Sequence, residues 1–309
     1  MRFRCRSGTN QENRASYLAA VRRLLITLFF LMVVSVPVDV SALFCSATLH
    51  VKRQFPGSMD FYQRRFPAAD WQAVSLAAWD HAQLRAWFIR PRQHSEGCVI
   101  VLHGISDSRS GGVGFAPMFL ERGYAVLAPD SRAHGESGGE LVTYGLLERY
   151  DTVDWAHWLL RSGCSRLYGL GESLGASVLI EATALEPVFR AAAAESAYSD
   201  LPAIAESRLP TPALLSNAIV RGGMAYAYVR FGLDFAQTSP LQAIAITTTP
   251  ILLIHGLQDE KTPPWHSRAL AAANTRAVLW LVPNAGHTGA ASAAPLEFRQ
   301  RVLAWFAAH

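Results

Sequence analysis

The 309-residue sequence has few charged residues, and no long run of them shares one sign. Charged residues make up 17% of the chain and apolar residues 50%, which excludes an intrinsically disordered protein. Residues 1–23 hold six arginines and one acid, so the rest of the chain has one more acidic than basic side chain. The overall charge of +4 therefore comes from the N-terminus, and a surface that tracks nucleic-acid phosphates is excluded.

Cysteine is also scarce, with four residues in the whole chain. They form no C-x-x-C pair and no Cys/His spacing of the kind that binds zinc, so neither a disulfide scaffold nor a metal site is predicted. Cys98 and Cys164 each lie at or just before the start of an apolar run. They are either two buried free thiols or, in an oxidising compartment, a disulfide pair.

No linker rich in Pro, Gly or Ser and no internal repeat divides the chain, which predicts one globular unit over residues 46–309 behind a leader of residues 1–45. In that leader, Arg22 and Arg23 precede fifteen uncharged residues, 24–38, which extend to 21 residues if the stretch is continued to Phe44 with Asp39 inside it. We favour an uncleaved membrane anchor over residues 24–44. A signal peptide cut near residues 40–42 and a buried helix of the body are the alternatives. Either export alternative places the body on the extracytoplasmic side.

Strand-like and helix-like segments alternate from residue 71 onward. An antiparallel pair at residues 71–79 and 83–91 precedes short apolar runs, the form of strands buried on both faces. Regular alternation predicts an α/β fold, a mostly parallel sheet of about eight strands with helices on both faces. The further strands are expected at residues 98–102, 125–128, 166–170, 191–194, 251–254 and 278–282, and the helices at 115–122, 147–161, 174–186, 265–273 and 295–308.

Residues 197–246 interrupt this alternation. Prolines at 210 and 212 and glycines at 222, 223 and 232 predict several short apolar helices. The segment is either a lid over a site or an ordinary connection packed on the sheet.

The pattern G-x-S-x-G occurs twice, around Ser137 and around Ser173. A nucleophile elbow needs a strand that leads straight into a sharp turn and a helix that starts directly after it. Ser173 has both neighbours, whereas Ser137 has neither. We therefore assign Ser173 as the nucleophile.

A serine hydroxyl needs a base, and the base needs an acid that fixes its tautomer. Asp259 and His287 each follow a predicted strand, and in an open parallel sheet the carboxyl ends of the strands meet at one edge. Glu260 is the rival acid. The rival histidines, His255 and His266, are interpreted as loop-packing and exposed respectively.

The oxyanion that forms in such a reaction needs two N–H donors. One should follow the nucleophile, at Leu174, and the other should lie after the first central strand, at Ile105. His103 would orient that second loop by hydrogen bonds; the alternative is a solvent-facing histidine.

Taken together, these motifs make residues 71–309 resemble the α/β-hydrolases, and within them the serine aminopeptidase-like and prolyl-oligopeptidase-like hydrolases. The resemblance rests on His103-Gly104, the loop Asp130-Ser131-Arg132-Ala133-His134-Gly135-Glu136-Ser137-Gly138, the elbow at Ser173, His255-Gly256 with Asp259 and Pro263, and Gly286-His287.

The resemblance implies that the loop with Asp130, Arg132 and His134 braces the active-site face and that Ser137 is structural. It also implies that Cys98 and Cys164 lie at the same, amino-terminal edge of two neighbouring strands.

The family resemblance does not identify the substrate. An aminopeptidase holds an ammonium group with carboxylates, of which residues 197–246 offer only Asp200, Glu206 and Asp234. The apolar residues of that segment suit an acyl or aryl group better; these are Met224, Tyr226, Tyr228 and Phe231.

The sequence thus predicts a membrane-anchored or exported serine hydrolase, an esterase that forms an acyl-enzyme without cofactor or metal. Its partners would be a small ester or short peptide and, through residues 24–44, a membrane, but no nucleic acid. Peptidase and acyl-transfer activities need the same triad and are alternatives. A non-catalytic binding protein is disfavoured because all three triad members are present.

Overall fold

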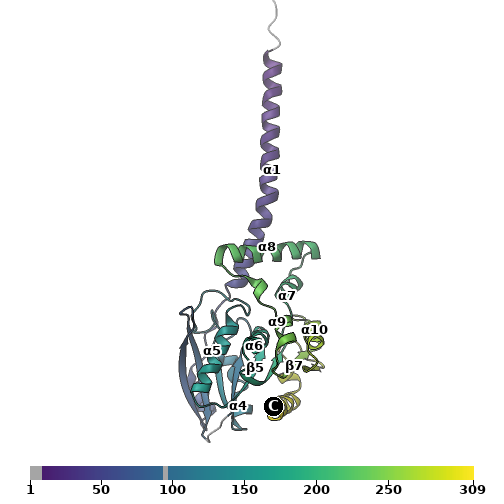
Figure 1. Cartoon of the computed structure of the whole chain (residues 1–309). Helices are drawn as coiled ribbons and strands as arrows, with labels where there is room; N and C mark the ends of the chain where they lie inside the picture. The colour runs from purple at the N-terminus through teal and green to yellow at the C-terminus, as the bar shows by residue number, and fades with distance from the viewer. Residues whose placement is uncertain (1–8, 93–96) are drawn as a thin grey trace, which may run out of the picture.

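An eight-stranded sheet forms the centre of the body (Figure 1). The computed structural model describes residues 9–92 and 97–309. The strand order is β1-β2-β4-β3-β5-β6-β7-β8, in which β2 pairs antiparallel with β1 and β4 and the other neighbours are parallel. The strands are β1 (Ala69–Ala77), β2 (Gln83–Pro91), β3 (Gly97–Leu102), β4 (Ala125–Pro129), β5 (Arg166–Glu172), β6 (Phe189–Glu195), β7 (Ile251–Gly256) and β8 (Val278–Val282). The predicted mostly parallel sheet is confirmed.

Helices cover both faces of this sheet. Apolar residues of β3 alternate between two cores, with Ile100 on the face of α5, α6, α9 and α10 and Val101 on the face of α3, α4 and α12. Every residue of β3 is buried, as a strand covered on both faces requires. The helices are α1 (Thr9–Leu49), α2 (Met59–Arg65), α3 (Arg109–Val113), α4 (Ala116–Leu120), α5 (Glu148–Arg161), α6 (Leu174–Leu185), α7 (Leu201–Ser207), α8 (Ala213–Phe231), η1 (Phe235–Gln237), α9 (Pro240–Ile246), α10 (Trp265–Ala273), α11 (Ala290–Ala293) and α12 (Pro295–Ala308).

Helix α1 projects from the body as a long stalk (Figure 1). Among the residues that the structure describes, no helix is both long enough and apolar enough to cross a membrane. The predicted membrane segment, residues 24–44, therefore gains no support from the structure. The side chains of residues 28–35, in its middle, lie outside the described part.

Helix α8 lies across α1 between the stalk and the rest of the body (Figure 1). It has 19 residues, so the expectation of only short helices in this segment was wrong. Gly222 and Gly223 lie inside α8 because they face α1: a β-carbon at Gly222 would be 2.4 Å from Ser41 Oγ, and one at Gly223 would be 3.3 Å from the Phe44 ring. The two glycines allow the helices to approach closely instead of ending α8.

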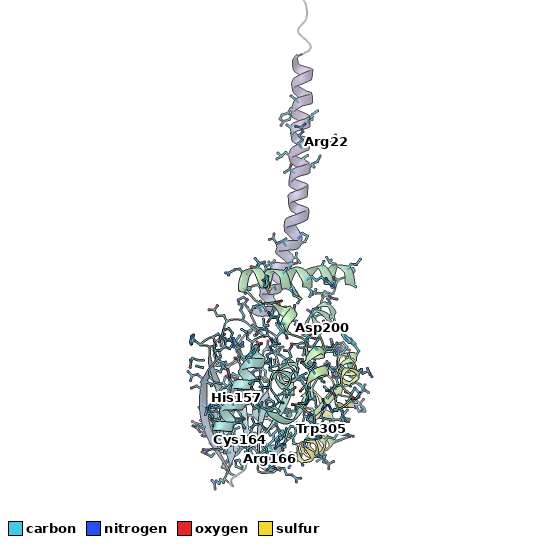
Figure 2. All side chains as sticks on the ribbon, viewed as in Figure 1. Arg22, His157, Cys164, Arg166, Asp200 and Trp305 are labelled. Atoms are coloured by element: carbon cyan, nitrogen blue, oxygen red, sulfur yellow. A yellow bond between two sulfur atoms is a disulfide. The ribbon has the colours of Figure 1, made fainter. Side chains whose placement is uncertain are left out.

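Cys98 and Cys164 form a disulfide, with their Cα atoms 5.9 Å apart. Strand β3 pairs in parallel with β5, which places both cysteines at the amino-terminal edge of the sheet. In Figure 2, Cys164 and Arg166 lie at the end of the body away from α8. Of the two alternatives for these cysteines, the structure thus has the disulfide, which lies at the opposite edge of the sheet from the carboxyl ends of the strands.

Replacing both cysteines with alanine is expected to lower the free energy of unfolding by about 4 kcal/mol, because the bridge closes a loop across 66 residues and restricts the unfolded chain. Urea unfolding with and without dithiothreitol measures this effect. Reductant should destabilise the wild type to a similar extent and leave the double variant unchanged. Equal urea midpoints for wild type and variant in the absence of reductant would contradict the prediction.

Candidate active site

Ser173 lies on a sharp turn between β5 and α6, as predicted from its two neighbours. Its backbone has φ 51° and ψ −114°, a left-handed conformation that is unfavourable for a residue with a β-carbon. The neighbouring strand β6 holds this turn in place, because the Ser173 N–H donates to the Glu195 carbonyl at 2.8 Å. The hydroxyl is thereby presented at the carboxyl edge of the sheet.

The two glycines of this motif are required by close backbone contacts. A β-carbon at Gly171 would lie 2.5 Å from the Gly175 carbonyl oxygen, and one at Gly175 would lie 2.4 Å from the Leu102 carbonyl oxygen. Neither distance is tolerated, so no other residue fits at either position without moving the turn.

The three predicted triad side chains meet in one hydrogen-bonded chain. Ser173 Oγ lies 2.8 Å from His287 Nε2, and His287 Nδ1 lies 2.9 Å from one Asp259 carboxylate oxygen and 3.1 Å from the other. The loop after β7 supplies Asp259 and the loop after β8 supplies His287. With Nδ1–H donating to the carboxylate, Nε2 is free to accept the serine proton.

Asp259 is buried, and burial alone would raise the pKa of its carboxyl group. Hydrogen bonds from His255, His287 and the Thr262 N–H outweigh that effect and lower its pKa below the usual range. The carboxylate therefore stays ionised at neutral pH and stabilises a protonated His287. The rival acid Glu260 is exposed.

The two rival histidines are both buried. His255 lies on β7 and packs against the loop that follows, as predicted, and it also reaches the site: its Nε2 lies 3.3 Å from an Asp259 oxygen and 2.6 Å from the Thr262 carbonyl. The prediction that His266 is exposed was wrong. The Trp265 ring stacks on it, and its Nδ1 accepts from the Ser199 N–H at 3.1 Å. Burial and then the neighbouring His255 lower the pKa of His266 to about 4.

Both predicted oxyanion residues, Ile105 and Leu174, line the same pocket as Ser173. Gly104, directly before Ile105, packs on Ser173, since a β-carbon there would lie 3.4 Å from Ser173 Cβ. Leu174 is the first residue of α6, where a backbone N–H has no partner within its helix. Within the described residues, neither N–H forms a hydrogen bond.

Two buried histidines join the loop after β3 to the loop after β4. His103 Nδ1–H donates to the Gly104 carbonyl at 2.7 Å, and its Nε2 accepts from the Ser131 N–H at 3.0 Å. His134 Nε2 accepts from the Ser106 N–H at 3.1 Å. His103 is 1% exposed, which excludes the alternative of a solvent-facing side chain.

Asp130 and Arg132 hold the second of these loops in shape. The Asp130 carboxylate accepts from the N–H groups of Arg109 and Glu136, at 2.7 and 2.8 Å. Arg132 makes a two-pronged contact with Asp151, each hydrogen bond being 2.7 Å long, and a third hydrogen bond to Asp80. These buried contacts fit the bracing role that the family resemblance implies.

The serine of the other G-x-S-x-G motif, Ser137, is buried in the same loop. Its hydroxyl donates to the Asp130 carbonyl at 2.7 Å and accepts from the Arg85 N–H at 2.9 Å. Both contacts are to backbone, so the hydroxyl holds the loop against β2. No histidine in the described part of the chain contacts this hydroxyl.

Two residues at the end of β6 hold the loop that carries His287, and neither was predicted from the sequence. Glu195 accepts from the Ala290 N–H at 2.8 Å, and Ser196 Oγ accepts from the Thr288 N–H at 3.2 Å. The one available signal was an acid directly after four alanines in a predicted strand. Burial raises the pKa of Glu195 to about 7, although the Ala290 N–H and His255 oppose the shift. Burial and then repulsion from Glu195 and Asp107 raise the pKa of Glu172 to about 8.

Replacing Glu195 with glutamine is expected to flatten the pH dependence of stability. In the folded protein the raised pKa keeps Glu195 protonated up to about pH 7, whereas the unfolded chain loses that proton near its ordinary pKa. The stabilisation from the bound proton is therefore present at acidic pH and is lost as the pH rises from about 4.5 to 7, by up to about 3 kcal/mol. Urea unfolding at pH 5 and pH 8 measures this loss.

Glutamine keeps an oxygen for the Ala290 N–H, so the Glu195→Gln variant isolates the proton from the hydrogen bond. The exposed Glu121→Gln variant is the control and should retain the wild-type pH dependence. An unchanged pH dependence in Glu195→Gln would contradict the assignment.

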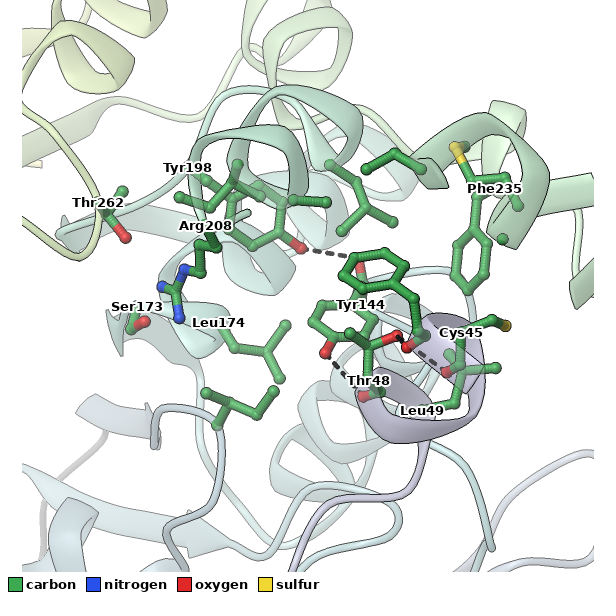
Figure 3. Close-up of a pocket in the computed structure, with 18 residues that line it drawn as sticks. Cys45, Thr48, Leu49, Tyr144, Ser173, Leu174, Tyr198, Arg208, Phe235 and Thr262 are labelled. Carbon is green, nitrogen blue, oxygen red and sulfur yellow. Dashed lines mark hydrogen bonds between the residues drawn. The ribbon is translucent and has the colours of Figure 1, made fainter. Parts of the chain in front are cut away.

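An apolar pocket opens beside Ser173 (Figure 3). One wall comes from the C-terminal end of α1, which crosses the predicted boundary between residues 45 and 46. The Tyr198 hydroxyl donates to the Tyr144 carbonyl at 2.9 Å, and the Tyr144 hydroxyl donates to the Thr48 carbonyl at 2.8 Å, which ties α1 to the body. The lining residues are Phe44, Cys45, Thr48, Leu49, Ile105, Tyr144, Ser173, Leu174, Tyr198, Leu201, Ile204, Ala205, Arg208, Val220, Gly223, Met224, Phe235 and Thr262. Across the described ranges, no group of three or more His, Cys, Asp or Glu side chains is arranged to hold a metal ion.

Comparison with known proteins gives matches over most of the body. Residues 99–304 match the alpha/beta hydrolase family. An uncharacterised protein of Bacillus subtilis, YqkD, is 26% identical over 227 residues, which are 69% of this chain and 71% of YqkD. The uncharacterised Escherichia coli protein YfhR is 24% identical over 229 residues, which are 72% of this chain and 75% of YfhR.

Solved structures share the fold. The Pyrococcus furiosus esterase Pf2001 superposes with a TM-score of 0.68 at 23% identity, over 84% of this chain and 97% of the esterase. Est1E of Butyrivibrio proteoclasticus, solved with ferulic acid bound, gives 0.62 at 19% identity, over 76% of this chain and all of Est1E. A puromycin-hydrolysing peptidase of Mycobacterium tuberculosis also gives 0.62, at 21% identity, over 77% of this chain and 39% of the peptidase.

Proposed function

Because the chain belongs to the alpha/beta hydrolase family, we propose that this hydrolase is a serine esterase that acts through an acyl-enzyme. The observation that carries the proposal is the hydrogen-bonded chain from Ser173 through His287 to Asp259. Nucleophile, base and orienting acid within hydrogen-bond reach are the signature of covalent acyl transfer.

In the proposed reaction, Ser173 Oγ attacks the ester carbonyl while His287 Nε2 takes the hydroxyl proton. The N–H groups of Ile105 and Leu174 stabilise the negative oxygen of the tetrahedral intermediate. His287 then returns the proton to the leaving alcohol, which leaves an acyl group on Ser173. Water then attacks the acyl-enzyme carbonyl while His287 takes a proton from the water. His287 returns this proton to Ser173 Oγ as the acid leaves.

The surroundings of the pocket favour an ester over a peptide with a free amino terminus. The three carboxylates between residues 197 and 246 are engaged elsewhere: Asp200 accepts from the Ala203 N–H, Glu206 from Asn217, and Asp234 from the Ala236 N–H. None of them lines the pocket. Among the described residues that line the pocket, an ammonium group would find no carboxylate, whereas an apolar acyl group would be covered by apolar side chains.

A substrate panel on the full-length protein tests this proposal. We expect hydrolysis of 4-nitrophenyl esters, with kcat/KM rising from acetate to longer acyl chains, and no comparable cleavage of alanine 4-nitroanilide. Cleavage of the anilide in preference to every ester would favour the peptidase alternative. Product esters formed in the presence of added glycerol would favour acyl transfer.

We also propose that residues 24–44 attach the enzyme to a membrane and that the body lies on the extracytoplasmic side. Arg22 and Arg23 flank the segment on its N-terminal side, which suits a cytoplasmic N-terminus. Exposed apolar side chains of α8 next to α1 would suit a membrane surface, and the Cys98–Cys164 bridge would suit an oxidising compartment. The exposed residues of α8 are Leu214, Leu215, Tyr228 and Val229. Protease added outside the cytoplasmic membrane should digest the body, and protection of the body there, together with full alkylation of Cys98 and Cys164 in intact cells, would place it in the cytoplasm instead.

A further inference from the structure

The pocket beside Ser173 has a single charged side chain among the described residues that line it. That side chain is Arg208, and all other lining residues are apolar, hydroxyl-bearing or the thiol of Cys45. Burial raises the pKa of the Cys45 thiol, which keeps it neutral. A pocket with one permanent positive charge is suited to a ligand with one negative charge.

Within the described part of the chain, the Arg208 side chain forms no hydrogen bond and no ion pair; the backbone N–H donates to the Ala205 carbonyl at the end of α7. It directly follows α7, whose one acidic residue, Glu206, already accepts a hydrogen bond from Asn217 at 2.8 Å. Two buried arginines near the site, Arg109 and Arg132, are both paired with carboxylates. Arg208 thus offers its guanidinium donors to a ligand.

The guanidinium group points toward the reacting end of the pocket. Figure 3 shows it directed at Ser173 and Leu174, while Tyr144, Phe235 and the end of α1 surround the other end. Arg208 is exposed to solvent, so it lies at the open mouth rather than at the apolar end. An anionic group would stay hydrated at this mouth but would lose its hydration deeper in the pocket.

We propose that Arg208 binds an anionic group on the alcohol side of the ester, so that the substrate is an ester between an apolar acid and an alcohol that carries a phosphate or carboxylate. The inference rests on the proposed function, since it takes Ser173 as the attacking group. The acyl chain lies between α1, α7 and α8, and the charged alcohol leaves through the mouth. Arginine contacts both anions with paired N–H donors, so the two sources share one chemistry.

Binding of ether analogues to the full-length Ser173→Ala protein tests this proposal without turnover. The three probes are 1-O-hexylglycerol, its 3-phosphate and the 3-hexyl ether of glyceric acid, which differ in charge and not in chain. Isothermal titration should show that at least one anionic probe binds about tenfold or more tightly than the neutral one. The anionic probe that binds more tightly shows whether the charged group of the substrate is a phosphate or a carboxylate.

Adding Arg208→Gln should remove this difference while changing the affinity for 1-O-hexylglycerol less than about threefold, and Arg208→Lys should retain part of it. Arg221→Gln is the matched control, because Arg221 lies on α8 outside the pocket lining. Equal binding of all three probes, or an equal loss for all three in Arg208→Gln, would overturn the proposal. Since no hydrolysis is measured, a failure of Ser173 to react with a fluorophosphonate would count against the proposed esterase activity alone.

Discussion

Replacing Ser173 with alanine is expected to abolish both ester hydrolysis and labelling by a fluorophosphonate probe. The Ser173 hydroxyl is the one that His287 contacts, at 2.8 Å, and the strained turn presents it at the mouth of the apolar pocket. Removing the oxygen removes the atom that forms the acyl-enzyme, so the expected loss in kcat is on the order of 10⁵ or more. Gel fluorescence after labelling and a 4-nitrophenyl ester assay measure the two effects.

Ser137→Ala is the matched control, because Ser137 occupies the same motif elsewhere in the chain. It should still be labelled. Its backbone partners, the Asp130 carbonyl and the Arg85 N–H, would lose their contact, so we expect stability to fall by about 1–3 kcal/mol. Loss of labelling in a folded Ser137→Ala variant, with labelling retained in Ser173→Ala, would reverse the assignment.

Single alanine replacements of His287 and Asp259 are each expected to lower kcat by a factor on the order of 10³ or more. The two side chains act in series on one proton, since Asp259 contacts His287 Nδ1 and His287 Nε2 contacts Ser173. The double variant should therefore be little worse than the poorer single variant. Steady-state kinetics of all three proteins with one ester measure the coupling.

His157→Ala provides the control for this comparison. His157 is a half-exposed histidine on α5 that pairs with Glu186 on the protein surface. Its removal should leave kcat within about threefold of wild type. Losses that multiply in the double variant would show that His287 and Asp259 contribute independently and do not form one unit.

The sheet and the meeting of the three triad residues were predictable from local pattern. Central strands such as β3 and β7 are buried on both faces and therefore appear as uninterrupted apolar runs. In a parallel sheet the residues after such runs converge at one edge, which is why Asp259 and His287 could be placed beside Ser173 without knowledge of the intervening loops.

Contacts between distant segments were not predictable in this way. Glycines such as Gly222 and Gly223 usually interrupt a helix, but a helix tolerates them when a second helix packs against them. His266 is the second residue of a helix that follows two prolines, and its burial depends on Trp265 and Ser199. Such positions are determined by tertiary contacts that leave no period or motif in the sequence.

The course of α1 has a practical consequence for recombinant production. Leaders of this kind are usually trimmed to obtain a protein that needs no detergent. The boundary predicted from the sequence would place the start of such a protein at residue 46. Such a trimmed protein would lack Phe44 and Cys45 from the wall of the pocket and Ser41 from its contact with α8. Its preference among acyl chain lengths would then describe a widened cavity, and activity profiles should be taken from the full chain.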